Sequence, residues 1–97
     1  MNLGDAIASL EQGRRVARTG WNGAGMWLVL VPGSAITVTA DRPLGLAAPE
    51  LIGQQTSYHP HVDMWTADGT LVPWVPSQSD LLGKDWVVIP ESVPDVL

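Results

Sequence analysis

The fold is constrained most by a single amphipathic helical stretch at the N-terminus, after which glycine and proline divide the chain into short strand-like runs. The apolar residues of this stretch follow the i, i+4, i+7 spacing of one helix face: Leu3, Ile7 and Leu10. Asn2 is a suitable N-cap and Gly13 a suitable stop, so we predict a helix over residues 3–12. One helix followed by antiparallel strands gives the α+β class, with the N-terminal helix packed on a twisted antiparallel β-sheet.

The strand-like runs differ in pattern and therefore in predicted burial. Residues 26–31 are continuously apolar, which predicts a strand buried on both faces before the turn at Pro32 and Gly33. Residues 35–39 alternate apolar and polar side chains and predict the returning, half-exposed strand. Further extended segments are predicted at residues 14–18, 58–66, 71–75 and 85–89.

Two short motifs specify turns. Asp68-Gly69 is a preferred hairpin dipeptide and predicts that residues 58–66 and 71–75 pair, with Pro73 on an edge strand. Ser77, three residues before Asp80, predicts a capped short helix that follows the hairpin.

Two segments show no regular period. Residues 40–57 carry Pro43, Gly45, Pro49 and Gly53 and predict a long loop, which we expect to act as a lid. Residues 90–97 contain two prolines and predict a loose C-terminal tail. We therefore expect a single domain over residues 1–89.

Composition limits the class of protein. Hydrophobic residues make up 45% of the 97 residues, a balance that can fill a core. The net charge of −5 excludes a generic binder of nucleic acid polymers. No apolar run approaches the roughly 18 residues of a membrane span, no signal peptide is apparent and cysteine is absent, so we expect a soluble cytosolic protein. A domain this small has modest stability alone, which favours a homo-oligomer.

The charge is unevenly spread along the chain. Residues 1–42 hold four Arg and three acidic residues, whereas residues 43–97 hold one Lys and seven acidic residues. We therefore expect any anionic ligand to bind near residues 14–18, which include Arg18.

One cluster could support metal-dependent catalysis. His59, His61 and Asp63 alternate, so on a single strand they would share one face and could form a two-His, one-carboxylate site. Pro60 interrupts ideal strand geometry, and such ligands rarely complete a site alone. No nucleophile elbow or P-loop occurs. We expect no catalytic residue, no bound metal and no cofactor.

Tryptophan is over-represented, with five Trp, one Tyr and no Phe. Trp21-Asn22 lies in a glycine-rich loop, Trp27 begins an apolar run, and Trp74 stands shortly before Ser77-Gln78. Indole faces stack on nucleobases and amides read purine edges, so this set suits a small nucleotide. The alternative is that these indoles form the core, which is the better interpretation for Trp86; Trp65, before the hairpin turn, is predicted to be exposed.

Several stretches occur together in a recognisable order. They are VARTGWNG at residues 16–23, PHVDM at 60–64, TADGTLVPW at 66–74, SQSDLL at 77–82 and Asp85-Trp86. Over about residues 2–89 the chain resembles the small phage proteins of the second Thoeris anti-defence family.

This resemblance implies a non-enzymatic sponge that acts in the cytoplasm of an infected bacterium. Family members bind cyclic ADP-ribose isomers made by bacterial TIR-domain enzymes, so that the Thoeris effector is not activated, and some also bind cyclic dinucleotides. The implied assembly is a homotetramer with ligand sites between protomers. The implied aromatic contacts are Trp21, Trp27 and Trp74, and the implied polar contacts are Asn22, His61, Asp63, Ser77 and Gln78.

Two other classes of function remain open from the sequence. A metal-dependent phosphodiesterase using His59, His61 and Asp63 would destroy such a signal instead of holding it. A protein-interaction module using exposed Trp would bind no nucleotide.

Overall fold

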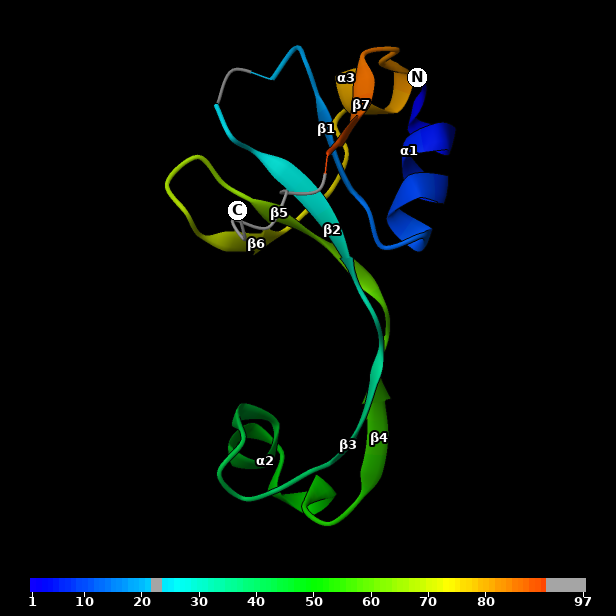
Figure 1. Cartoon of the computed structure of the whole chain (residues 1–97). Coiled ribbons are helices and arrows are strands. Elements are labelled where there is room, and N and C mark those ends of the chain that lie inside the picture. Colours follow the sequence, from blue (N-terminus) through cyan, green and yellow to red (C-terminus); the bar gives the residue numbers. More distant parts are fainter. Residues whose placement is uncertain (22–23, 91–97) are drawn as a thin grey trace, which may run out of the picture. The chain divides into compact units, whose positions relative to one another are not determined.

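The computed structural model describes residues 1–21 and 24–90, which form two compact units. The first unit combines Met1–Val31 with the chain from Val62 onward, and the second is Pro32–His61. Figure 1 shows the two units and their elements. Among the described residues, no helix has the length and apolar character needed to cross a membrane.

The first unit begins with the predicted helix, α1 (Leu3–Glu11). The Asn2 side chain accepts a hydrogen bond from the Asp5 backbone N–H, and the Asp5 carboxylate accepts one from the Asn2 N–H. This capping box satisfies donors that the first helical turn leaves without partners. The predicted N-terminus of the helix is therefore confirmed.

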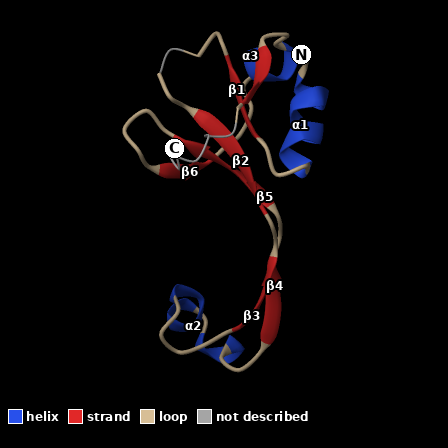
Figure 2. Ribbon diagram, in the orientation of Figure 1, coloured by secondary structure: helices blue, strands red, loops and turns tan. Residues whose placement is uncertain are grey.

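A five-stranded sheet packs with this helix, in the order β6-β5-β2-β1-β7 (Figure 1), and Figure 2 shows its strands in red. Its strands are β1 (Arg15–Arg18), β2 (Trp27–Val31), β5 (His61–Trp65), β6 (Leu71–Pro73) and β7 (Trp86–Ile89). β1 pairs antiparallel with β2 and with β7, and β5 pairs antiparallel with β6. The α+β class, with one N-terminal helix and a mostly antiparallel sheet, is confirmed.

The core lies between α1 and one face of this sheet. Its buried residues are Ala6, Leu10, Val16, Leu28 and Trp86. The prediction that residues 26–31 are buried on both faces is wrong, because Leu28 alone is buried in β2 and its neighbours are half-buried. A single helix covers one face of a sheet, so side chains on the other face of β2 keep part of their exposure.

The hairpin and the short helix of the first unit follow the predicted motifs. The Thr66 N–H donates to the Thr70 carbonyl at 2.8 Å, and Gly69 has the positive φ of 83° that this turn requires. β6 is an edge strand, which accommodates Pro73. After it, α3 (Gln78–Leu82) begins with the predicted cap at Ser77.

The second unit contains β3 (Ser34–Thr37), α2 (Pro43–Ala47), the 3-10 turn η1 (Pro49–Leu51) and β4 (Gln55–Tyr58). The prediction of a long loop over residues 40–57 is wrong. Pro43 is suited to the first turn of a helix because the N–H it lacks would have no partner there. Hydrogen bonds from the Val38 N–H to the Gln54 carbonyl and from the Gly53 N–H to the Val38 carbonyl close the unit.

Two strand predictions also need correction. β3 pairs antiparallel with β4, so it does not return beside β2. The single strand predicted over residues 58–66 is two strands, because β4 ends at Tyr58 and β5 begins at His61. Pro60 stands between them and has no N–H to donate to a ladder. The predicted tail and the domain boundary at residue 89 stay predictions, since residues 91–97 lie outside the described part of the chain.

Candidate functional site

Two of the predicted ligand-stacking residues converge on a third indole. The Trp21 ring meets the Trp86 ring edge-on, with centroids 5.5 Å apart and an interplanar angle of 81°. The Trp74 ring meets Trp86 in the same way, at 5.9 Å and 85°. Trp86 is 1% exposed, which confirms it as core, whereas Trp21 and Trp74 are half-buried against it. Trp86 therefore forms the floor of an aromatic cluster, and the other two indoles keep part of their surface exposed.

A buried carboxylate holds this cluster in place. The Trp21 Nε1–H donates to Asp80 Oδ1 at 3.1 Å, and Arg18 Nη1 donates to the same oxygen at 2.9 Å. The Ser77 backbone N–H donates to Asp80 Oδ2 at 2.9 Å. The Asp80 carbonyl accepts a hydrogen bond from Trp86 Nε1 at 3.0 Å. Asp80 thus contacts two of the three indoles through hydrogen bonds.

These hydrogen bonds decide the ionisation of Asp80. Burial by itself would raise the pKa of this carboxyl group. The hydrogen bonds from Ser77, Trp21 and Arg18 favour the carboxylate and together outweigh that effect, so the pKa of Asp80 lies below its ordinary value of 3.8. Asp80 is therefore ionised at neutral pH.

Arg18 joins a second carboxylate to the same network. Its Nε donates to Asp85 Oδ1 at 2.8 Å, and the Gly20 backbone N–H donates to Asp85 Oδ2 at 2.8 Å. The hydrogen bond to Arg18 lowers the pKa of Asp85, and the hydrogen bonds to Asp85 and Asp80 raise the pKa of Arg18. Two nitrogens of this guanidinium are thus engaged inside the protein.

The third predicted aromatic contact belongs to a different group of side chains. Trp27 in β2 stacks on Trp65 in β5, with centroids 5.7 Å apart and planes 12° from parallel. The Arg15 guanidinium of β1 lies over the Trp27 ring, 5.1 Å from its centroid. Because β1 and β5 flank β2 in the sheet, Arg15 and Trp65 approach Trp27 from the two neighbouring strands. Trp65 is half-buried in this row, so the prediction that it is exposed is wrong.

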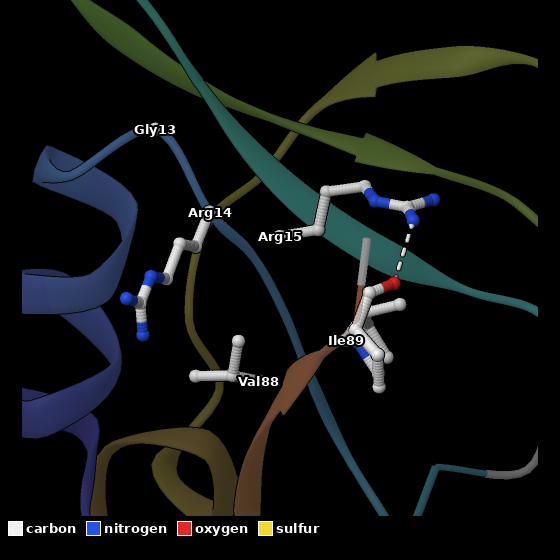
Figure 3. Close-up of a pocket in the computed structure, with 6 residues that line it drawn as sticks. Gly13, Arg14, Arg15, Val88 and Ile89 are labelled. Atoms are coloured by element: carbon white, nitrogen blue, oxygen red, sulfur yellow. Dashed lines mark hydrogen bonds between the residues drawn. The ribbon is translucent and has the colours of Figure 1, made fainter. Parts of the chain in front are cut away.

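The arginine-rich segment borders a pocket of about 390 Å³ at the start of β1 and the end of β7. Figure 3 shows Arg14 and Arg15 extending in different directions from adjacent positions beside Val88 and Ile89. Arg15 Nη2 donates to the Pro90 carbonyl at 3.2 Å. The two cations give this edge of an acidic protein a local positive charge.

The sequence as a whole matches a known family. Residues 1–89 match the Thoeris anti-defense 2-like domain. The chain belongs to this family. It is 35% identical over 89 residues to the protein named Thoeris anti-defense 2 from Bacillus phage SP01, an alignment that covers 92% of this chain and 94% of that protein. The resemblance inferred from the residue motifs is confirmed.

In this member of the Thoeris anti-defense 2-like family, the predicted polar contacts are spread over several elements. Ser77 caps α3, where its hydroxyl accepts a hydrogen bond from the Asp80 N–H at 3.1 Å, and Gln78 follows it on the exposed side. His61 and Asp63 lie in β5. Asn22 lies outside the described residues. The structure therefore brings together Arg18, Trp21, Trp74 and Ser77, and places Trp27 with Arg15 and Trp65.

The alternating metal triad does not have the geometry that its spacing suggested. His59 lies outside β5, which begins at His61, so the three side chains do not alternate along one strand. Within the described parts of the chain, no group of three or more His, Cys, Asp or Glu residues is placed to hold a metal ion.

Sequence reasoning identified the indoles and missed the carboxylates that hold them. The spacing of Ser77 and Asp80 indicated a helix cap, which is correct. It gave no sign that Asp80 also binds Arg18 and Trp21, because these residues are 62 and 59 positions away. Chemically, the cluster offers half-exposed indole surface suited to stacking on a planar ligand, whereas Arg18 is already paired with two carboxylates.

Proposed function

We propose that the protein binds and sequesters cyclic ADP-ribose-type signalling nucleotides inside the infected bacterium, and so prevents activation of the Thoeris effector without cleaving the signal. The observation that carries this proposal is membership of the Thoeris anti-defense 2-like family over residues 1–89. Cyclic dinucleotides are a second ligand class that the same sponge would take.

The geometry supports a small aromatic, anionic ligand. Trp21 and Trp74 each meet Trp86 nearly at a right angle and remain half-buried, so part of each indole surface is exposed to a base. Arg14 and Arg15, at the opposite end of the β1–β7 pair from these indoles, supply positive charge in a protein whose net charge of −5 opposes an anionic ligand. The ligand would therefore stack on the indoles while the arginines attract it at longer range, and neither interaction requires a chemical step.

The test uses a cyclic ADP-ribose isomer made by a bacterial TIR-domain enzyme. Mixing it with the purified protein should lower the free ligand in proportion to the protein added and saturate at a fixed ratio. Heating should return the ligand unaltered, because denaturation removes the pocket that binds it. Chromatography of the heated sample measures both quantities.

The two alternative functions give different results in the same experiment. A phosphodiesterase would consume excess ligand at trace protein concentration, leave a linear product after heating and lose activity in a metal chelator. A protein-interaction module would leave the free ligand unchanged at every protein concentration. Either result would contradict the proposal that the protein sequesters the nucleotide.

A further inference from the structure

Asp80 differs from the other acidic residues of the described chain in its burial and in its partners. It is the buried charged residue of this part of the protein, with 7% of its surface exposed. Oδ1 accepts hydrogen bonds from Trp21 and Arg18, and Oδ2 accepts one from the Ser77 N–H. Each carboxylate oxygen of Asp80 therefore accepts at least one hydrogen bond.

We propose that Asp80 is a positioning residue, which fixes the ring of Trp21 in the orientation that the nucleotide requires. This inference rests on the proposed function, because the ligand of Trp21 is the proposed nucleotide. Asp80 itself acts through the Trp21 indole and needs no contact with the ligand.

Two contacts restrict rotation of the Trp21 ring. The Trp21 Nε1–H donates to Asp80 Oδ1 at 3.1 Å, and the Trp21 ring packs against Trp86 in a T-shaped pair with centroids 5.5 Å apart. The Trp86 indole is itself held by the Asp80 carbonyl. A side chain fixed before binding loses less conformational entropy when the ligand arrives, so loss of the Asp80 contact should weaken binding even where the ring remains.

Asp85 provides a matched control. It also accepts a hydrogen bond from Arg18, through Oδ1 at 2.8 Å, and its second oxygen binds the Gly20 N–H. Asp80→Asn and Asp85→Asn therefore each remove one charged partner of Arg18. Of the two residues, Asp80 is the one that accepts the hydrogen bond from the Trp21 indole.

Asp80→Asn keeps the shape of the side chain and changes its hydrogen bonding. A carboxamide has one acceptor oxygen where the carboxylate has two. The oxygen of Asn can face either Trp21 and Arg18 or the Ser77 N–H, and the amide nitrogen then faces the other donors. The variant therefore keeps the packing of the site but no longer satisfies all three donors.

The experiment is a double-mutant cycle measured by calorimetry, with the cyclic ADP-ribose isomer made by a bacterial TIR-domain enzyme as the probe. The proteins are the parent, Asp80→Asn, Asp85→Asn, Trp21→Ala and the Asp80→Asn/Trp21→Ala double variant. We expect Asp80→Asn to weaken binding about tenfold or more and Asp85→Asn to weaken it less than about threefold. In the Trp21→Ala background, Asp80→Asn should have almost no further effect, since residues that act through one another are not additive.

A second pair of variants keeps the inference testable if Asp80→Asn does not fold. Trp21→Phe retains an aromatic ring and the Asp80 carboxylate but removes the Nε1–H donor, whereas Trp74→Phe makes the same change in a ring that meets Trp86 from another position. We expect the larger loss of affinity for Trp21→Phe. Folding of every variant is checked by near-UV circular dichroism at the temperature of the titration.

The outcomes separate this inference from the proposed function. If the parent protein does not bind the probe, the proposed function is wrong, and the proposed role of Asp80 in binding is wrong as well. Suppose instead that the parent binds the probe but Asp80→Asn weakens binding no more than Asp85→Asn does, or weakens it equally in the Trp21→Ala background. Asp80 then has a structural role only, and the proposed sequestration of the nucleotide is unaffected. For the phenylalanine pair, equal losses would overturn the role of Asp80.

Discussion

The indole N–H of Trp21 donates to Asp80 Oδ1 at 3.1 Å, although the two residues are 59 positions apart in the sequence. Trp21 follows β1, and Asp80 lies in α3, immediately before β7. The pairing of β1 with β7, in which Arg18 lies opposite Trp86, brings these two segments together. The aromatic cluster is therefore a product of sheet topology, and its residues form a site only in the folded chain.

Removal of either half-buried indole should weaken ligand binding while the fold survives. Trp21→Ala and Trp74→Ala should each cost about 1–3 kcal/mol of binding free energy, the usual value of one base–indole stack. Calorimetry with the cyclic ADP-ribose isomer measures the loss, and circular dichroism confirms the fold. Normal affinity in either variant would show that the indole does not touch the ligand.

Trp86 should behave differently, because it is the floor of the cluster and belongs to the core. Trp86→Ala leaves a cavity beneath both neighbouring indoles and a carbonyl of Asp80 without its donor. The expected loss of unfolding free energy is about 3–5 kcal/mol, as for other buried aromatic residues. Urea denaturation followed by circular dichroism measures it. A loss below about 1 kcal/mol would contradict the assignment of Trp86 to the core.

Acid should destabilise the protein by protonating Asp80 and Asp85, the two carboxylates that bind Arg18. The pKa of Asp80 and the pKa of Asp85 both lie below the ordinary 3.8, so the folded state binds these protons less readily than the unfolded chain. Their stabilising contribution is complete above the unfolded pKa and is lost as the pH falls through the folded values. Thermal melts between about pH 7 and pH 2 should show this loss beginning near pH 4. In Asp80→Asn the acid-dependent part of the loss should be smaller, and an unchanged profile would contradict the role of the carboxylate.

Short sequence motifs correctly predicted the helix caps and the hairpin turn, because neighbouring residues determine these features. The capping residues Asn2 and Ser77 begin helices, and Asp68-Gly69 forms the hairpin turn. Each of these features is settled within about five residues, so a pattern of residue types is enough to identify it. The family, too, was recognisable from short motifs.

Features that depend on distant residues were not predictable in the same way. The partner of β3 is β4, which lies beyond a helix and a 3-10 turn, and the alternating pattern of β3 does not identify that partner. The row formed by Arg15, Trp27 and Trp65 depends on the order of three strands in the sheet. The two carboxylates around Arg18 depend on the pairing of β1 with β7. The residue types indicated that indoles and charged side chains would be important, but they did not indicate which of these side chains would contact one another.

Gly83 should tolerate no side chain because Arg18 passes directly over it. A Cβ built at Gly83 would lie 2.9 Å from Arg18 Nε and 3.0 Å from Asp85 Oδ1. Gly83 has a φ of −64°, which alanine adopts without strain, so the effect of Gly83→Ala comes from this contact alone. We expect a lower melting temperature, because Arg18 must move away from Asp85. Ser79→Ala, on the exposed side of α3, is the control and should leave the melting temperature unchanged; equal behaviour of the two variants would show that Arg18 accommodates the methyl group.

Assembly into a homotetramer is the last prediction. The number of subunits is what the family resemblance implies, and exposed apolar side chains are the candidate contacts. In the first unit Val75 is 82% exposed and Leu82 is 76% exposed, and in the second unit Leu46 is 70% exposed. Single exposed apolar side chains are normal on a protein surface, so these residues identify positions to test and do not fix the number of subunits.

Light scattering coupled to size exclusion should therefore report about four times the 10.4 kDa mass of one chain at micromolar concentration. Leu46→Glu and Leu82→Glu place a charge at one exposed apolar residue of each unit in turn, and a variant whose substituted residue lies in an interface should show a lower mass, since burying an unpaired charge is costly. Lys84→Glu changes charge by a larger amount on an exposed polar residue and should leave the mass unchanged. A parent protein that stays monomeric at these concentrations would contradict both the tetramer and a ligand site shared between protomers.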